Sequence, residues 1–382
     1  MRPAFSLARL LRAELHCVTW GLLLALSSAG RAQADWRTAG RVQSSYGGDS
    51  NVDEALDARA RQADQFFRIL GEAELERDRL PLGARASLGL RGFREDYREL
   101  SREKRAQGEA RLSLLVPLTR RGSSLRLEAA GAARSYPAVP DSASRDYDRK
   151  WLSLQGEAPL GPSGVLRTSL RLFALDFHRT PRPDQWGSGF DLTYEHPLRG
   201  RLVGQIGFEL AGTRHGTPSV QWGDPDQGRT VVVGPPDQRD TVRHIHVGVR
   251  WMRRALVRLQ YGFRTQSSNS LGSSFHRHEV RWLGALPVPF RLTLETYGNV
   301  EHTDYTDSHL EEVYIFRGGE EVEARDDNNQ VALGATRPLF GDVSVELRHA
   351  WYRNESLLLE TYYTKRVWSL ALGWNAGRSS VF

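Results

Sequence analysis

The chain has 382 residues and a formal net charge of +6, with basic and acidic side chains interspersed along its length. Half of that excess lies in the first 34 residues, and the rest of the chain is too evenly charged to indicate nucleic-acid binding. Cys17, the only cysteine, lies in the same segment, which excludes disulfide and thiol chemistry from the remainder.

The N-terminus has the pattern of a secretory signal peptide. Basic residues precede an apolar run from Val18 to Ala29, and Ala32-Gln33-Ala34 fits the small-x-small cleavage rule. The run is too short for a spanning helix, and no stretch of about 18 apolar residues follows it. We therefore predict a signal peptide over residues 1–34, cleavage after Ala34, and a single exported domain over residues 35–382.

Beyond the signal peptide, apolar and polar residues alternate with a period of two, which is typical of strands. From residue 109 to 116, for example, Leu112 and Leu114 share one face while Arg111 and Ser113 share the other. A strand of about 13 residues tilted by about 40° rises roughly 33 Å along the membrane normal, enough to cross a bilayer. The predicted strands cover residues 36–46, 64–76, 82–96, 104–117, 123–136, 148–160, 164–178, 187–198, 201–214, 241–252, 255–267, 274–286, 290–303, 326–338, 341–353 and 363–376.

The connections between these strands alternate between short and long. A proline pair marks most of the short ones, because proline fixes φ and lacks the N–H that a central ladder needs; Trp251 to Ala255 fills one further short turn without proline. The pairs are Pro81-Leu82, Pro117-Leu118, Pro159-Leu160, Pro197-Leu198, Pro287-Val288 and Pro338-Leu339. The long connections are Gly47–Ala63, Pro137–Tyr147, Gly216–Asp240 and Asp304–Arg325. They indicate solvated outer loops, the last with a hairpin at Gly318-Gly319, and they place the short turns and both termini on the periplasmic side.

Aromatic residues near the strand ends suggest belts at the two membrane interfaces. The alternative is the ordinary enrichment of aromatic residues in strands. The predicted belt residues are Trp36, Trp251 and Trp282 at the short turns, and Tyr136, Tyr147, Trp151, Trp186, Tyr305, Tyr352 and Tyr362 at the outer ends.

Two segments resemble those of Gram-negative outer-membrane β-barrels. The last strand presents Leu370, Leu372 and Trp374 on one face before the terminal Phe382, which resembles the assembly signal of such barrels. The segment from Tyr46 to Val52 is similar to a Tyr-Asp-x-Asn-Val turn found in many of them, polysaccharide-export pores included. The resemblance implies a porin-like or export-pore-like, all-β, transmembrane antiparallel up-and-down barrel of about 16 strands in the outer membrane. It further implies contact with outer-membrane lipids and the barrel-assembly machinery.

If the apolar faces meet lipid, the charged faces must line a lumen, because each midplane arginine on the lipid side would cost about 2–4 kcal/mol. About sixteen strands enclose an aqueous channel. An Arg-weighted wall suits anionic or heavily hydroxylated solutes, although cross-strand ion pairing that only rigidifies the wall is the alternative. The predicted pore-lining residues are Arg85, Arg91, Glu109, Arg111, Arg126, Glu128, Arg134, Arg167, Arg171, Glu195, Glu209, Arg250, Arg258, Arg264, Glu279, Arg281, Arg291, Glu295, Glu346 and Arg348.

Two histidine pairs, His244-x-His246 and His276-x-His278, have the spacing that places both rings on one face of a strand. The alternation puts the two pairs on opposite sides of the wall, and no close set of carboxylates or cysteines completes either one. We therefore predict surface or rim histidines, with no metal site and no cofactor.

We predict a channel and not an enzyme: a passive porin or export pore for polar or anionic solutes, or more narrowly the outer-membrane conduit of a polysaccharide secretion system with a separate periplasmic partner. A non-conducting surface or adhesin barrel is one alternative, because the loops are long. A barrel-embedded hydrolase is another, since Ser274 lies near His276, but no nucleophile motif surrounds them. A soluble secreted β-sandwich would have shorter strands.

Overall fold

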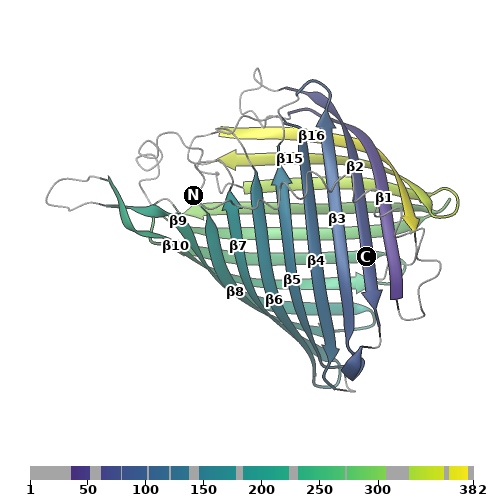
Figure 1. The fold of residues 1–382 in the computed structure, drawn as a ribbon, viewed down its shortest axis with the longest axis horizontal. Helices are drawn as coiled ribbons and strands as arrows, with labels where there is room; N and C mark the ends of the chain where they lie inside the picture. The colour runs from purple at the N-terminus through teal and green to yellow at the C-terminus, as the bar shows by residue number, and fades with distance from the viewer. Residues whose placement is uncertain are drawn as a thin grey trace, which may run out of the picture.

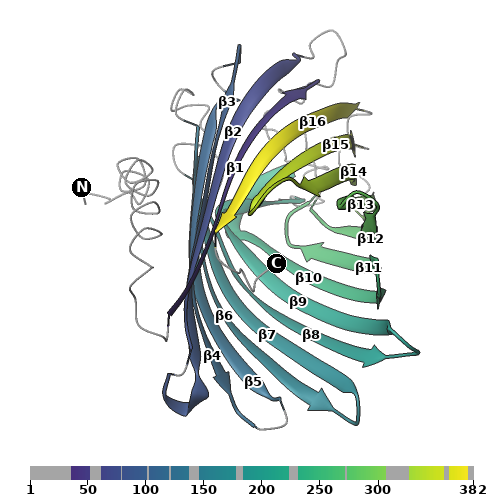
Figure 2. The same cartoon turned by 90° about the vertical axis from the view of Figure 1, so that its right-hand side faces the viewer.

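The computed structural model describes residues 36–51, 62–78, 80–100, 103–119, 122–136, 146–177, 184–222, 231–271, 273–306, 327–356 and 361–376. The predicted signal peptide lies outside them. The described strands form one closed antiparallel barrel of sixteen strands, each paired with its neighbours in sequence, and β16 lies beside β1 where the barrel closes (Figures 1 and 2). The described residues include no helix of a length and hydropathy that could cross a membrane. The prediction of an all-β, sixteen-stranded up-and-down barrel is confirmed.

The strands have the following bounds. They are β1 (Trp36–Asp49), β2 (Asp64–Arg77), β3 (Arg85–Tyr97), β4 (Arg105–Pro117), β5 (Ser124–Ser135), β6 (Tyr147–Leu160), β7 (Gly164–Phe177), β8 (Gln185–Pro197), β9 (Leu202–Trp222), β10 (Val231–Met252), β11 (Leu256–Ser268), β12 (Phe275–Val288), β13 (Leu292–Tyr305), β14 (Asp327–Pro338), β15 (Val343–Ser356) and β16 (Thr361–Ala376). Apart from the loop-side ends of β9 and β10, these ends lie within about three residues of the predicted ones.

Apolar side chains lie outside the barrel and polar ones inside, the reverse of a soluble protein. On β7, Leu170 and Leu172 are 54% and 58% exposed, whereas Glu95 and Glu279 are among the largest fully buried side chains of the described residues. Because successive residues of a strand point to opposite faces, an outward leucine fixes its charged neighbour inside. The fold is therefore that of a transmembrane barrel, with lipid-facing leucines and a charged lumen.

The short turns lie where the proline pairs predict them. The strands β4, β6, β8 and β14 end at Pro117, Leu160, Pro197 and Pro338. The turn without proline is also present: β10 ends at Met252, β11 begins at Leu256, and the N–H of Arg253 donates to the carbonyl of Ala255 at 3.0 Å. The hairpin predicted at Gly318-Gly319 lies outside the described residues.

The prediction of a solvated loop from Gly216 to Asp240 is wrong over most of its length. In the structure β9 continues to Trp222 and β10 begins at Val231, so the two strands extend as a hairpin past their neighbours (Figure 1). A hairpin outside the bilayer has no lipid-facing side, so its strands need no apolar alternation and were not recognised. Side chains tie its base instead, since His215 Nε2 and Asp240 Oδ2 lie 2.9 Å apart and both residues are buried.

The barrel closes through the described part of the Tyr46–Val52 segment. The Asp49 carboxylate forms an ion pair with Lys365 at 2.8 Å and accepts the N–H of Asn51 at 3.0 Å. A Cβ on Gly48 would overlap the indole of Trp368, so the glycine lets this ring pack across the seam. Of the predicted assembly signal, Leu370, Leu372 and Trp374 are exposed on the outward face of β16, and Phe382 lies outside the described residues.

The prediction for the aromatic belts is partly wrong. The cross-strand register turns Trp36, Trp186 and Trp251 outward, but it turns Tyr147 and Trp151 into the lumen. There the guanidinium of Arg134 lies 4.5 Å from the ring centre of Tyr147 and that of Arg149 lies 5.3 Å from Trp151. Closeness to a strand end does not determine which face a residue occupies, and these rings serve as stacking partners for lumenal arginines. The outward aromatic residues near the long-loop end are Tyr46, Phe67, Trp186, Trp351 and Trp368.

A charged lumen as the candidate functional site

The register places the predicted pore-lining residues on the inner faces of their strands, with one exception. Arg91, for example, stands opposite Glu72 of β2 and Glu109 of β4. The exception is Arg291, which lies in the short turn between β12 and β13 with a φ of 58°. Its prediction as a lumenal residue is wrong, because this turn sits at the end of the barrel and its positive φ takes the residue out of the strand alternation.

Strands β1 to β4 form what we call the paired wall, because every arginine on their inner faces has a carboxylate oxygen within 4.0 Å. The Nε of Arg91 lies 3.1 Å from Glu72, and Glu95, 1% exposed, forms ion pairs with both Arg68 and Arg105. The paired arginines are Arg37, Arg41, Arg68, Arg85, Arg91, Arg105 and Arg111.

Strands β5 to β11 form what we call the arginine-rich wall, because its inward arginines outnumber the carboxylates that contact them and much of the positive charge is uncompensated at short range. Arg167 and Arg250 share the carboxylate of Glu195. Within the described ranges, the other inward arginines of this wall have no carboxylate oxygen within 4.0 Å. They are Arg126, Arg134, Arg149, Arg171, Arg258 and Arg264.

The strand register explains the difference. On the paired wall, opposite charges face each other directly across neighbouring strands, as in Arg68 opposite Glu95 and Arg91 opposite Glu109. On the arginine-rich wall Glu157 stands opposite Arg167, but two pairs of like charge also face each other: Arg250 stands opposite Arg258, and Asp191 stands opposite Glu209. Opposite charges stabilise such pairs and like charges destabilise them.

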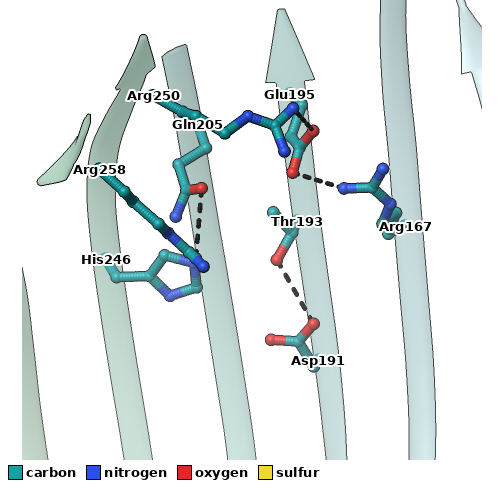
Figure 3. A pocket seen from close by; sticks show the side chains of 8 residues that line it. All are labelled: Arg167, Asp191, Thr193, Glu195, Gln205, His246, Arg250 and Arg258. Atoms are coloured by element: carbon teal, nitrogen blue, oxygen red, sulfur yellow. Dashed lines mark hydrogen bonds and ion pairs between the residues drawn. The ribbon is translucent and has the colours of Figure 1, made fainter. Parts of the chain in front are cut away.

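A recess of about 330 Å³ opens into the lumen between β7 and β11 (Figure 3). Its lining residues are Arg167, Asp191, Thr193, Glu195, Gln205, His246, Arg250 and Arg258. Glu195 lies between Arg167 and Arg250, whereas Arg258 reaches toward the His246 ring and contacts the side-chain oxygen of Gln205 at 3.5 Å. The recess therefore has a cationic end at Arg250 and Arg258, where Glu195 neutralises part of the charge, and an acidic side at Asp191.

Two inward-facing glycines make room for the histidines of this wall. A Cβ on Gly207 would overlap the imidazole of His246, and one on Gly262 would lie 2.5 Å from Nε2 of His244. His244 is consequently 4% exposed, with Nε2 3.1 Å from Glu279 and Nδ1 3.5 Å from Glu209.

The prediction of surface or rim histidines is wrong for His244, which is buried in the inner wall. The predicted opposite orientation of the two pairs is present, since His276 and His278 face outward, where the His276 ring stacks on Phe263 and the His278 ring contacts it at a tilt. In the part of the chain that the structure describes, no group of three or more His, Cys, Asp or Glu side chains could hold a metal ion. Ser274, the candidate nucleophile, accepts the N–H of Ser268 at 3.1 Å, while His276 lies on the outward face.

The sequence prediction missed several lumenal residues. His246, Thr193 and Gln205 line the recess but were not among the predicted pore-lining residues. Each is separated by an even number of positions from a residue that was predicted on the same strand, so the alternation could have found them. The prediction considered charged residues and passed over uncharged polar ones.

A closed antiparallel barrel with an even number of strands, an apolar outer face and a charged lumen defines a transmembrane β-barrel. No protein-family model and no curated protein matches the chain. Among solved structures, the chain is similar to CdiB from Acinetobacter baumannii, with 9% identity, a TM-score of 0.48, and coverage of 88% of this chain and 60% of CdiB. It therefore spans less than two thirds of CdiB.

Two further solved structures cover nearly the whole barrel. An anion-selective porin from Comamonas acidovorans has 11% identity and a TM-score of 0.47, with 89% of this chain and 99% of that one covered. OprB of Pseudomonas putida has 8% identity and a TM-score of 0.47, with 90% and 94% covered.

Proposed function

We propose that the chain is an outer-membrane channel that passes polar and anionic solutes. The observation that carries this proposal is the exposure of the lumenal arginines. The side chains of Arg91, Arg111 and Arg281 point inward and yet remain 60%, 50% and 46% exposed. A wall filled by its own side chains would bury them, so the described lumen has room for water and solute.

The arginine-rich wall supports a preference for anions. Arg171, Arg258 and Arg264 have no carboxylate oxygen within 4.0 Å among the described residues, so no close ion pair neutralises them and their charge also acts on the lumen. Charges on a low-dielectric wall focus the field in an aqueous passage and raise the local concentration of counter-ions. Passing anions therefore meet a favourable potential along this wall.

A conduit for secreted polysaccharide is the narrower form of the same proposal. Guanidinium, carboxylate and amide groups around the lumen supply donors and acceptors for sugar hydroxyls. In this form the barrel receives its polymer from a separate periplasmic protein, and outer-membrane lipids and the barrel-assembly machinery are its other partners. We propose no catalytic role, in agreement with the outward position of His276.

Single-channel recording tests the proposal. The full chain, refolded in detergent and inserted into a planar bilayer, should give discrete conductance steps. Under a salt gradient the reversal potential should indicate anion selectivity, which should weaken as ionic strength rises because salt screens the arginines.

Two results would contradict the proposal. Protein with the circular dichroism of a folded β-barrel that gives no conductance would favour a non-conducting surface barrel. A cation-selective current would leave a channel but overturn the preference for anions.

A further inference from the structure

The recess between β7 and β11 retains an arrangement that lowers the stability of the wall. Arg250 and Arg258 are direct cross-strand partners, and so are Asp191 and Glu209. Like charges in these positions repel each other. Within the barrel, the paired wall shows that the fold accommodates opposite charges in equivalent positions, as in Arg91 opposite Glu109. The like-charge pairs therefore point to a ligand.

Arg258 is the cation of the recess with the weakest protein contacts. Its Nη2 lies 3.2 Å from the side-chain oxygen of Gln260 and 3.5 Å from that of Gln205, both uncharged acceptors. Arg250 contacts Glu195 only at 3.5 Å, because that carboxylate also binds Arg167. An anion placed between Arg250 and Arg258 would relieve their repulsion and accept charge-assisted hydrogen bonds.

The remaining lining residues offer hydrogen bonds to a hydroxylated molecule. Asp191 accepts the hydroxyl of Thr193 at 3.4 Å, a long bond that leaves the carboxylate available as an acceptor. His246 also lines the recess, although its Nδ1 is buried and has no hydrogen-bond partner among the described residues (Figure 3). Acceptors at Asp191 and donors at Arg258 thus stand on different sides of one cavity.

We propose that this recess binds a carboxylated sugar unit, with its carboxylate between Arg250 and Arg258 and its hydroxyls toward Asp191, Thr193 and Gln205. The inference deepens the proposed function and rests on it. The volume of about 330 Å³ is at the lower end of the range of about 300–1,000 Å³ for small-molecule sites, which suits one sugar ring.

The charge distribution selects a hydroxylated monoanion over other occupants. A dianion would place its second charge toward Asp191, where it would be repelled. A neutral sugar would leave the repulsion between Arg250 and Arg258 in place. A carboxylated sugar has one charge for the cationic end and hydroxyls for the acidic side.

Calorimetric titration of the full chain in detergent tests the site without requiring conductance. D-glucuronate should bind, and D-glucose, which has a CH₂OH group in place of the carboxylate, should bind at least tenfold more weakly. Arg258→Gln should weaken glucuronate binding at least tenfold. Arg37→Gln, a substitution at an inward arginine of the paired wall that is 57% exposed, should leave the Kd within twofold.

Equal affinity for glucose and glucuronate would overturn the inference, as would unchanged binding by Arg258→Gln or no binding of glucuronate at all. The comparison of the two sugars on the unaltered chain needs no variant, so it decides the matter even if Arg258→Gln fails to fold. The results that would contradict the proposed function differ from those that would contradict the recess site. Absent conductance with glucuronate bound would leave a sugar-binding barrel, and conductance without glucuronate binding would remove only the recess site.

Discussion

The two walls of the lumen have similar numbers of inward arginines, but the arginines of the two walls differ in their contacts with carboxylates. On the paired wall each inward arginine has a carboxylate oxygen within 4.0 Å, and Glu95 is enclosed by two of them. On the arginine-rich wall Arg258 stands opposite Arg250, and its hydrogen bonds go to the glutamines Gln205 and Gln260. The paired wall uses its charges to hold strands together, whereas the arginine-rich wall keeps charge available to the lumen.

The difference follows from what stands opposite each arginine and not from the number of arginines. Opposite charges directly across two strands contribute roughly 0.2–1 kcal/mol each, and like charges cost a similar amount. A barrel wall made only of opposite pairs would be more stable and its field would be largely neutralised. We infer that the like-charge pairs of the arginine-rich wall lower its stability and that its arginines give the lumen a positive electrostatic potential.

The largest expected effect comes from removing Glu95, the carboxylate that two arginines of the paired wall share. Glu95→Ala removes the carboxylate between Arg68 and Arg105, whose side chains are 38% and 31% exposed. Loss of one partner of a fully buried pair costs about 3–5 kcal/mol, and partial hydration of the two arginines reduces the expected loss to about 2–4 kcal/mol. The midpoint and slope of urea unfolding in detergent, followed by circular dichroism, measure it.

The matched control for Glu95→Ala lies on the arginine-rich wall. Glu157 is 44% exposed and lies 2.9 Å from Nε of Arg167, so Glu157→Ala should lower the free energy of unfolding by less than about 1 kcal/mol. If Glu95→Ala and Glu157→Ala lowered the free energy of unfolding equally, the burial of Glu95 would make no difference to the strength of its ion pairs.

A second prediction compares the space available for a methyl group at one inward glycine of each wall. In Gly207→Ala the new methyl group would overlap the His246 ring and lie 2.9 Å from Oγ1 of Thr193, so the imidazole, which lines the recess, must move. We expect a loss of about 0.5–1.5 kcal/mol from the displaced side chain, together with weaker glucuronate binding. Urea unfolding and calorimetric titration measure the two effects.

Gly89 provides the corresponding site on the paired wall. A Cβ there would meet no atom closer than 4.0 Å, the nearest being Cβ and the carbonyl oxygen of Arg111. Gly89→Ala should therefore raise stability by up to about 0.5–1 kcal/mol, because alanine loses less backbone entropy than glycine. A larger loss in Gly89→Ala than in Gly207→Ala would contradict the difference in space beside the two glycines.

The sequence predicts the barrel and its two faces because the bilayer imposes one simple rule. Leu170 and Leu172 must face lipid, which places Arg171 in the lumen whatever its partner is. The rule does not apply to residues outside the bilayer. The β9–β10 hairpin has no lipid to face, so its strands beyond Gly216 show no alternation, and the sequence there predicts a loop.

The sequence does not predict the division of the lumen into two walls, for a different reason. Whether Arg258 meets Arg250 or an uncharged residue depends on the register set by the turn at Arg253–Ala255, and a shift of the pairing would change every cross-strand partner. The burial of His244 likewise depends on Gly262, which lies on the neighbouring strand. Contacts between side chains of neighbouring strands depend on the register. The face that a side chain occupies and the length of a strand follow from the periodicity of the sequence.

The smallest expected effect is a difference of sign between the walls. Arg258→Gln removes one member of a like-charge pair and should raise the free energy of unfolding by about 0.2–0.5 kcal/mol, since both groups are partly hydrated. Arg91→Gln removes the ion pair with Glu72 at 3.1 Å and should lower it by about 0.2–1 kcal/mol. Urea unfolding of both variants and the parent chain in one detergent resolves the sign when the slopes agree.

Salt separates this electrostatic account from a packing effect of the substitutions. Both differences should shrink when the ionic strength is raised from about 0.01 M to 1 M, because the screening length falls from about 30 Å to about 3 Å. If both variants shifted stability in the same direction, or if their difference survived high salt, lost side-chain packing would explain the data and the contrast between the walls would not be electrostatic. Opposite shifts that salt removes would mean that the arginine-rich wall retains Arg258 at a cost to its own stability.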